Sequence, residues 1–288
     1  MYKITASGSK AAVQAAWDTL AWSDPTPADA VDAREETRAL WRLDAYAQDE
    51  AAAAACADII KGSSADLSPS IAPVEDKDWV RVSLEGLPAV EAGPFLVAGS
   101  HALTAASPGK IPILIEAGPA FGTGHHGTTL GCLLAFDRIR RREKPERVLD
   151  VGTGSGVLAI AALKTGSRSA IGTDIDGDSV AIARENAEKN AATGAFKAIT
   201  AKGCQSSRVR QGAPYDLVFA NILARPLVRL APDIRKVTRP GGTIILSGLL
   251  THQEPQVRRA YEGQGLCLID RLHKDVWSTL VYRKQTIH

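Results

Sequence analysis

One stretch of this 288-residue chain decides its fold, Val148-Leu149-Asp150-Val151-Gly152-Thr153-Gly154-Ser155-Gly156. An apolar strand runs directly into three alternate glycines, and the apolar residues 157–164 continue as a helix. Glycines allow positive φ angles and let a ligand approach the backbone, while the start of a helix presents free N–H groups. The stretch therefore predicts a strand, a ligand-binding loop and a helix of an α/β domain.

The spacing of the glycines bears on the kind of ligand. It is G-x-G-x-G, and Val157 stands where the dinucleotide fingerprint has its last glycine. The methionine end of S-adenosylmethionine carries a carboxylate that needs such N–H donors, and it has no pyrophosphate to place. The loop alone leaves two alternatives open. It could be a glycine-rich turn that binds no ligand, or the chain could be a nicotinamide-dependent oxidoreductase.

Strands and helices alternate after this loop. We expect strands at 147–151, 170–173, 197–201, 215–220 and 243–247. The helices between and after them are expected at 157–164, 179–190, 224–237 and 255–262. This order implies a doubly wound, mostly parallel sheet with right-handed crossovers. A terminal hairpin, 266–272 with 276–282, adds antiparallel structure at one edge, and a plain dinucleotide-binding domain ends differently.

The first 65 residues have a different pattern. Strands are expected at 2–6, 29–34 and 40–46, and helices at 11–20 and from Asp49 to about Gly62, with a turn at 35–37. This pattern predicts a small α+β domain at 1–65. Residues 62–69 have the composition of a linker, and the short β-like runs at 79–84, 95–98 and 111–116 follow it. We therefore expect a linker and connector at 66–118 and the catalytic domain at 119–288.

Composition limits the class of protein. The chain is 45% apolar and 23% charged, as in ordinary soluble proteins, and no apolar run reaches the roughly 18 residues of a membrane helix. The four cysteines are far apart, which favours reduced thiols and a cytoplasmic location. The net charge of +2 does not require a nucleic-acid partner. Residues 1–60 carry ten acidic and five basic side chains, so this segment could attract a basic protein or simply be a solvated surface.

Two polar side chains are expected at the ligand-binding edge of the sheet. Asp174 ends the second strand of the domain, where a carboxylate can accept both hydroxyls of a ribose, although NAD sites use the same arrangement. Asn221 ends the strand at 215–220, where its amide can both accept and donate hydrogen bonds. A helix N-cap is the competing interpretation of Asn221, and Asp176 is interpreted as a cap or a solvated residue.

A glycine-rich segment precedes the catalytic strands, Ala120-Phe121-Gly122-Thr123-Gly124-His125-His126-Gly127-Thr128-Thr129. Its two histidines are neighbours in sequence, which rarely converge on one ion, and no Asp, Glu or Cys stands at ligand spacing. We therefore expect no metal site and interpret the segment as a loop over the cofactor, with Phe121 as a candidate cofactor contact.

The segment at 120–129 resembles the signature of the ribosomal protein methyltransferases of the PrmA type. Residues 148–156, 216–224, 240–242 and 246–248 agree with that family, and the resemblance covers about 78–288. It implies a class I methyltransferase domain preceded by a small, ferredoxin-like α+β domain that recognises the substrate. Positions matching Thr129, Gly152, Asp174 and Asn221 contact S-adenosylmethionine in the family, and we add Gly154. Arg225 departs from the pattern, because the family usually has glycine there.

The resemblance also implies an activity. The expected enzyme is an S-adenosylmethionine-dependent protein-lysine N-methyltransferase. It would methylate lysine ε-amines and the N-terminal α-amine of the large-subunit ribosomal protein numbered eleven, with Asn221 placing the amine. We expect a cytoplasmic monomer with no membrane contact and no direct need for nucleic acid. Other acceptors, such as an RNA base, a protein glutamine or a small molecule, and a non-catalytic ribosome-binding role are the alternatives.

Overall fold

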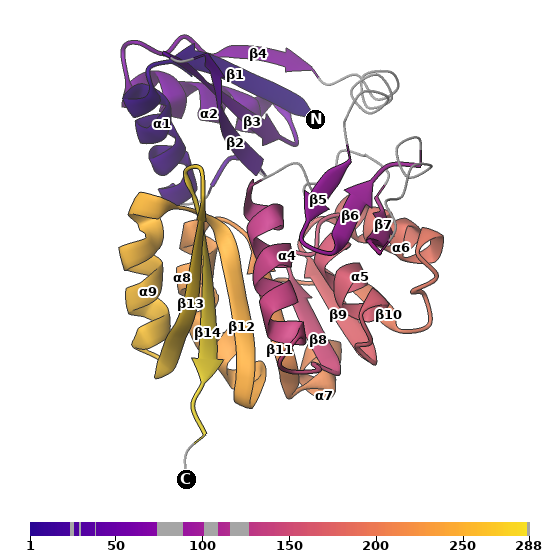
Figure 1. The fold of residues 1–288 in the computed structure, drawn as a ribbon. Coiled ribbons are helices and arrows are strands. Elements are labelled where there is room, and N and C mark those ends of the chain that lie inside the picture. Colours follow the sequence, from indigo (N-terminus) through magenta and orange to yellow (C-terminus); the bar gives the residue numbers. More distant parts are fainter. Residues whose placement is uncertain are drawn as a thin grey trace. The chain divides into compact units, whose positions relative to one another are not determined.

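A computed structural model describes residues 1–23, 26–28, 30–37, 39–73, 89–100, 109–115 and 127–286 (Figure 1). The chain divides into two compact units, Met1–Trp79 and Val80–His288. All four cysteines are free thiols, and three of them are buried. Among the described residues, no helix has the length and apolar composition needed to cross a membrane.

The first unit is a four-stranded antiparallel sheet with two helices. In chain order its elements are β1 (Tyr2–Gly8), α1 (Lys10–Trp22), β2 (Ala30–Thr37), β3 (Leu40–Ala47), α2 (Glu50–Ser63) and β4 (Ser70–Pro73). The strands lie in the order β2-β3-β1-β4, and each neighbouring pair is antiparallel. This βαββαβ arrangement confirms the predicted small, ferredoxin-like α+β domain.

Local chemistry explains the two helices of this unit. The Ser9 side chain accepts a hydrogen bond from the backbone N–H of Ala12 at 3.2 Å and so caps α1. The apolar face of α1 is buried, with Trp17 1% exposed. Asp49 caps α2 by accepting from Ala52 N at 2.8 Å, which explains why the helix begins directly after it.

Two details of the first unit differ from the sequence analysis. Strand β4 lies inside the expected linker and pairs with β1, so the unit extends past residue 65. All four β4 residues are exposed, and a short exposed strand is hard to distinguish from a linker by composition. The expected turn at 35–37 belongs to β2, because Glu35 and Thr37 pair with Trp41 and Leu40 of β3.

The second unit contains a seven-stranded sheet in the order β10-β9-β8-β11-β12-β14-β13 (Figure 1). The strands are β8 (Arg147–Val151), β9 (Ser169–Asp174), β10 (Phe196–Thr200), β11 (Tyr215–Asn221), β12 (Thr238–Leu250), β13 (Leu266–Lys274) and β14 (Trp277–Lys284). The first five are parallel, and β14 is antiparallel to both β12 and β13. This topology confirms the predicted doubly wound sheet with a terminal hairpin.

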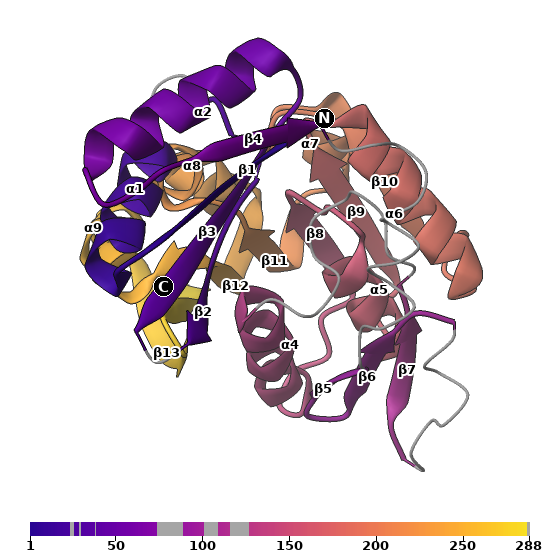
Figure 2. The same ribbon diagram turned by 90° about the horizontal axis from the view of Figure 1, so that it is seen from above.

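Six helices of the described chain belong to this unit and cover the sheet. They are α4 (Gly127–Arg140), α5 (Val157–Lys164), α6 (Gly177–Lys189), α7 (Ser207–Gly212), α8 (Ala224–Val237) and α9 (Glu254–Glu262). A 3₁₀ turn, Thr251–Gln253, precedes α9. Helices α4 and α5 lie on one side of the sheet and α8 on the other (Figure 2). The sequence analysis missed α4 and α7.

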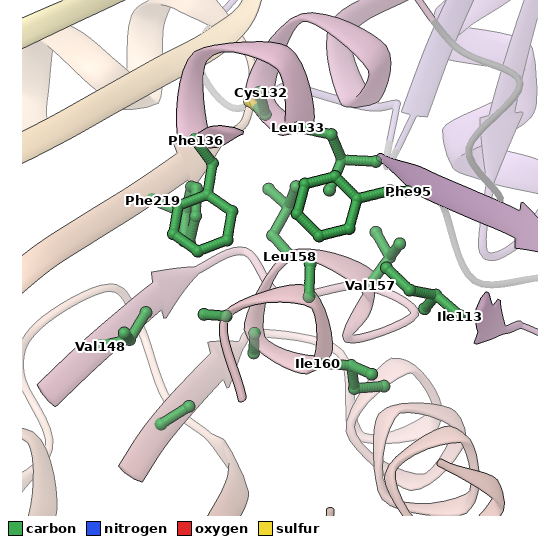
Figure 3. Packing of buried hydrophobic residues seen from close by; sticks show 14 of the residues in the cluster. Phe95, Ile113, Cys132, Leu133, Phe136, Val148, Val157, Leu158, Ile160 and Phe219 are labelled. Atoms are coloured by element: carbon green, nitrogen blue, oxygen red, sulfur yellow. The ribbon is translucent and has the colours of Figure 1, made fainter. Parts of the chain in front are cut away.

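A small three-stranded sheet joins the same unit. It consists of β5 (Val90–Ala92), β6 (Phe95–Ala98) and β7 (Ile111–Leu114), with β6 in the middle. Phe95 and Ile113 are fully buried in one core with residues of α4 and α5 (Figure 3). The segment expected as a connector therefore contributes to the core of the second unit.

Helix α4 packs closely on the sheet because it has glycine where it crosses β14. The Phe136 ring lies 5.5 Å from the Phe219 ring, edge to face, between α4 and β11 (Figure 3). On the same helix, a Cβ added to Gly131 would lie 2.2 Å from Oγ1 of Thr279. That distance is far too short, so any larger residue would push α4 away from β14.

We therefore expect Gly131→Ala to lower the free energy of unfolding by about 1–3 kcal/mol, the usual cost of overpacking. Urea denaturation followed by circular dichroism measures it. Gly177→Ala is the matched control, because Gly177 also lies in a helix and has no atom within 4 Å of an added Cβ. We expect the control to change stability by no more than about 1 kcal/mol. Equal stability of the two variants would contradict the packing argument.

Candidate functional site

The glycine-rich loop leads from β8 into α5. Gly152, Gly154 and Gly156 have φ angles of 70°, 51° and 82°, as the sequence analysis predicts. A Cβ at Gly152 would lie 2.2 Å from Cγ2 of Ile222. The loop therefore requires glycine at this position both for its backbone angle and for the space.

Hydrogen bonds fasten the loop to the end of β9. The backbone N–H groups of Gly152 and Thr153 both donate to the carbonyl of Thr173, at 2.8 and 2.9 Å. The next N–H, that of Gly154, donates to Oδ2 of Asp174 at 2.9 Å. The structure thus brings the loop and Asp174 together, as expected for two parts of one site.

The Asp174 carboxyl is held by backbone groups and partly buried. Its Oδ1 accepts from Asp176 N at 3.2 Å. Burial raises the pKa of Asp174, and the hydrogen bonds from Gly154 and Asp176 oppose that rise. A carboxylate has about four acceptor positions, so it can still accept hydroxyl groups of a ligand. Asp176 caps α6 by accepting from the N–H of Ser179 at 2.9 Å, which confirms its interpretation as a cap.

Asn221 lies at the end of β11 and does not cap the following helix. Helix α8 begins at Ala224, its N-cap is Leu223, and no side chain caps it. The Asn221 side chain is 9% exposed, and its Nδ2 donates to Oγ1 of Thr129 at 3.4 Å. Its Oδ1 is buried and has no hydrogen-bond partner among the described residues. A buried acceptor without a partner is costly in a folded protein, so this oxygen is a candidate ligand-binding group.

Helix α4 positions Thr129 beside Asn221. The helix begins at Gly127, and a Cβ there would lie 2.8 Å from Cδ1 of Trp277 at the start of β14. Together with the contact of Gly131 on Thr279, this close approach fixes the first turn of α4 on the sheet. Thr129 is fully buried in that turn. The segment 120–129 therefore contributes Thr129 to the site through a helix that the sequence analysis did not predict.

Two residues of the site were missed. Asp150 is 1% exposed in β8; its Oδ2 accepts from the Thr153 hydroxyl at 2.8 Å, and its Oδ1 has no partner among the described residues. Burial raises the pKa of Asp150 to about 7. Ile175 follows Asp174 and is 72% exposed, an unusual state for a large apolar side chain. The sequence contained a signal for each: Asp150 is an acid within an apolar strand, and Ile175 is an isoleucine between two acids.

Some expected contributors cannot be placed. Phe121, His125 and His126 lie outside the described residues. Within the described part of the chain, no three His, Cys, Asp or Glu side chains gather as a metal site would require. Arg225, where the family usually has glycine, lies in the first turn of α8.

The candidate site residues lie together at one edge of the sheet. The glycine loop follows β8, and Asp174 and Asn221 are the last residues of β9 and β11. These three strands are neighbours in the order β9-β8-β11. Ligands of open α/β sheets bind at this edge. It offers bare backbone, a carboxylate for hydroxyl groups, and a buried amide oxygen.

Comparisons with known proteins identify the family of the chain. The family described as ribosomal protein L11 methyltransferase (PrmA) matches residues 5–285. The protein of that name from Caulobacter sp. (strain K31) is 44% identical over 287 residues, which cover 98% of this chain and 97% of the relative. The one from Bradyrhizobium diazoefficiens is 49% identical over 211 residues, 73% of this chain and 72% of the relative.

A solved structure extends the comparison to the fold. The crystal structure of the ribosomal protein L11 methylase from Lactobacillus delbrueckii subsp. bulgaricus matches with a TM-score of 0.59 and 28% sequence identity. The match covers 69% of this chain and 100% of that one. With a family match over nearly its whole length, the chain belongs to the ribosomal protein L11 methyltransferase (PrmA) family.

Proposed function

We propose that this protein transfers methyl groups from S-adenosylmethionine to lysine ε-amines and the N-terminal α-amine of ribosomal protein L11. Family membership supports the acceptor protein. The observation that carries the chemistry is the Asn221 amide: its nitrogen is bonded to Thr129 and its buried oxygen is free to accept an N–H, at the carboxyl end of β11. Because ribosomal protein L11 is made in the cytoplasm, we place the reaction there.

The residues around the glycine loop fit the methyl donor. Gly152 and Gly154 leave backbone without side chains. Helix α5 begins at Val157, and its N-cap, Gly156, provides no side-chain cap, so the first N–H groups of the helix suit the donor's carboxylate. Asp174 would accept the ribose hydroxyls, and exposed Ile175 would pack against the adenine ring. When bound, the donor supplies an electrophilic methyl group on a positive sulfonium.

The acceptor amine must be neutral to react. At pH 7, removing the proton from a lysine with a pKa of about 10.4 costs roughly 4.6 kcal/mol. Desolvation in the site and a nearby positive charge both lower this cost. Asn221 would accept one N–H of the neutral amine and so direct the nitrogen lone pair. As the C–N bond forms and the C–S bond breaks, the nitrogen becomes cationic, and it must lose a proton to solvent before each further transfer.

The first unit, which includes residues 1–65, is proposed to recognise the acceptor protein. It folds as a separate compact domain, and it carries the acidic excess of the chain. Glu50 and Asp58 on α2 are exposed and available to basic side chains of a partner. A basic acceptor protein would be attracted by this charge.

Asn221→Ala is expected to lower kcat by about 100-fold, because the amine loses its positioning contact. Mass spectrometry of purified ribosomal protein L11, incubated with enzyme and methyl donor, measures the methyl groups transferred. Thr129→Val should show a smaller loss of the same kind, and Thr129→Ser, which keeps the hydroxyl, should be close to the unsubstituted protein. Unchanged turnover in Asn221→Ala would refute the assigned role.

Asp174→Asn is expected to weaken binding of S-adenosylmethionine about 10- to 150-fold, since it removes a charged acceptor of the ribose hydroxyls. Isothermal titration calorimetry measures the Kd. Asp178→Asn is the control: it removes a nearby negative charge of the same type, on the exposed first turn of α6. Equal affinities of the two variants would mean that Asp174 acts only through net charge.

A further inference from the structure

Two buried asparagines lie at the end of α6 and play no part in the site described so far. Asn186 is in the last turn of the helix and is 1% exposed, and Asn190 directly follows the helix and is 8% exposed. Burying an amide is costly unless its polar atoms are hydrogen-bonded. The partners of these two side chains therefore show what they are for.

Asn190 bonds to the last residue of β7 as a neighbouring strand would. The backbone N–H of Leu114 donates to its Oδ1 at 3.0 Å, and its Nδ2 donates to the Leu114 carbonyl at 2.6 Å. The same Nδ2 also donates to the Asn186 carbonyl at 2.8 Å. Asn190 thus fixes the end of β7 to the end of α6, and it braces the backbone of Asn186.

Asn186 reaches the glycine loop. Its Nδ2 donates to the carbonyl of Ser155 at 2.9 Å, and this bond is buried. The Ser155 carbonyl and the Gly156 N–H belong to the same peptide group. The Gly156 N–H donates to the Thr153 carbonyl at 2.8 Å. Both ends of the Ser155–Gly156 peptide are therefore bonded, and its orientation is fixed.

Steric contact adds to this hydrogen bond. A Cβ at Gly156 would lie 3.3 Å from Cβ of Ala183, one turn before Asn186 on α6. The same face of α6 therefore limits the position of the loop through Ala183 and its orientation through Asn186. Ser155 is itself 1% exposed, so water cannot replace the amide donor at its carbonyl.

We propose that Asn186 is a positioning residue for the methyl donor, and that Asn190 acts through it. The amide of Asn186 orients the Ser155–Gly156 peptide so that the first N–H groups of α5 face the carboxylate of the donor. Asn190 holds the carbonyl-bearing backbone of Asn186 in place and joins it to β7. This inference rests on the proposed function, because it assigns both asparagines to the binding of S-adenosylmethionine.

The expected signature is a change in affinity without a change in chemistry. In Asn186→Ala the Kd for S-adenosylmethionine should rise about 10-fold, because the Ser155 carbonyl loses its donor and the peptide can rotate. The kcat at saturating donor and ribosomal protein L11 should change by less than about twofold, because Asn221, the group proposed to position the amine, lies outside this loop. Calorimetry and mass spectrometry measure the two quantities.

Asn186→Asp supplies a second, pH-dependent test. Its protonated carboxyl can donate to the Ser155 carbonyl, whereas its ionised form has only acceptors and faces the carbonyl oxygen with like charge. Donor affinity of this variant should therefore be close to that of the unsubstituted protein at acidic pH and fall as the pH rises through the pKa of the introduced carboxyl. A merely structural asparagine would not give a donor Kd that follows this titration.

A double-mutant cycle tests the place of Asn190. Asn190→Ala alone should raise the donor Kd about threefold, and the double variant with Asn186→Ala should bind no more weakly than Asn186→Ala, since Asn190 acts through the same peptide. Arg184→Ala is the matched control on the same helix. It removes hydrogen bonds of 3.1 and 2.7 Å to the Ala198 carbonyl of β10, and it should leave the Kd unchanged.

The outcomes separate this inference from the proposed function. If the unsubstituted protein does not bind S-adenosylmethionine, the proposed function fails. If it binds but Asn186→Ala binds equally well, or if kcat falls while the Kd stays constant, the positioning role is refuted. Thermal unfolding of each variant is measured first, and binding is compared at a temperature where all of them are folded.

Discussion

The bonds between the glycine loop and the end of β9 are the constraint on which the rest of the site depends. Three consecutive N–H groups, from Gly152 to Gly154, are used by Thr173 and Asp174. These N–H groups are already hydrogen-bonded, so under the proposed function the N–H groups at the start of α5 are the ones left to bind the donor's carboxylate. The loop is therefore a fixed connection between β8 and α5. The position of Asp174 is fixed as well, because its carboxylate accepts one of the hydrogen bonds that hold the loop.

Burying the Asp150 carboxyl beside the glycine loop costs free energy. Its carboxyl is buried behind the loop, and burial raises its pKa to about 7, above the usual value of about 3.9 for a free carboxyl. Since folding favours the protonated form, its contribution to stability is greatest below pH 4 and declines as the pH rises through 7. The Thr153 hydroxyl donates to the Asp150 carboxyl and so offsets part of the cost of its burial. The backbone N–H of Thr153 donates to the Thr173 carbonyl, so Thr153 connects the loop to both β8 and β9.

The sequence was sufficient for the fold wherever the apolar pattern was regular. The strands at 147–151 and 215–220 were found because each is a short apolar run, and each is buried along nearly its whole length. Helix α1 was found because its apolar residues recur at helical spacing. Helix α4 was missed because it is buried on most sides, from Thr128 to Ile139, so its apolar residues show no helical period. Strand β4 was missed for the opposite reason, since it has no buried residue at all.

The site was predictable only in part, because sequence position reveals strand ends but not what side chains bond to. Asp174 and Asn221 were predicted because each ends a strand, which the structure shows as well. That Asp174 holds Gly154, and that Asn186 reaches Ser155 from a helix 31 residues further on, depends on how α6 packs beside the loop. The hydrogen bonds of a buried amide are set by tertiary packing, so periodicity cannot reveal them.

The state of Asn221 bears on how an amine can be methylated without a strong base. An ionised carboxylate in its place would stabilise an ammonium group and so oppose the loss of its proton. The amide oxygen of Asn221 is a neutral acceptor, and its nitrogen is already bonded to Thr129, which keeps the oxygen turned toward a ligand. An uncharged acceptor stabilises the ammonium ion less than a carboxylate would, so under the proposed function desolvation can still favour the neutral amine, and the neutral amine is the form that attacks the methyl group.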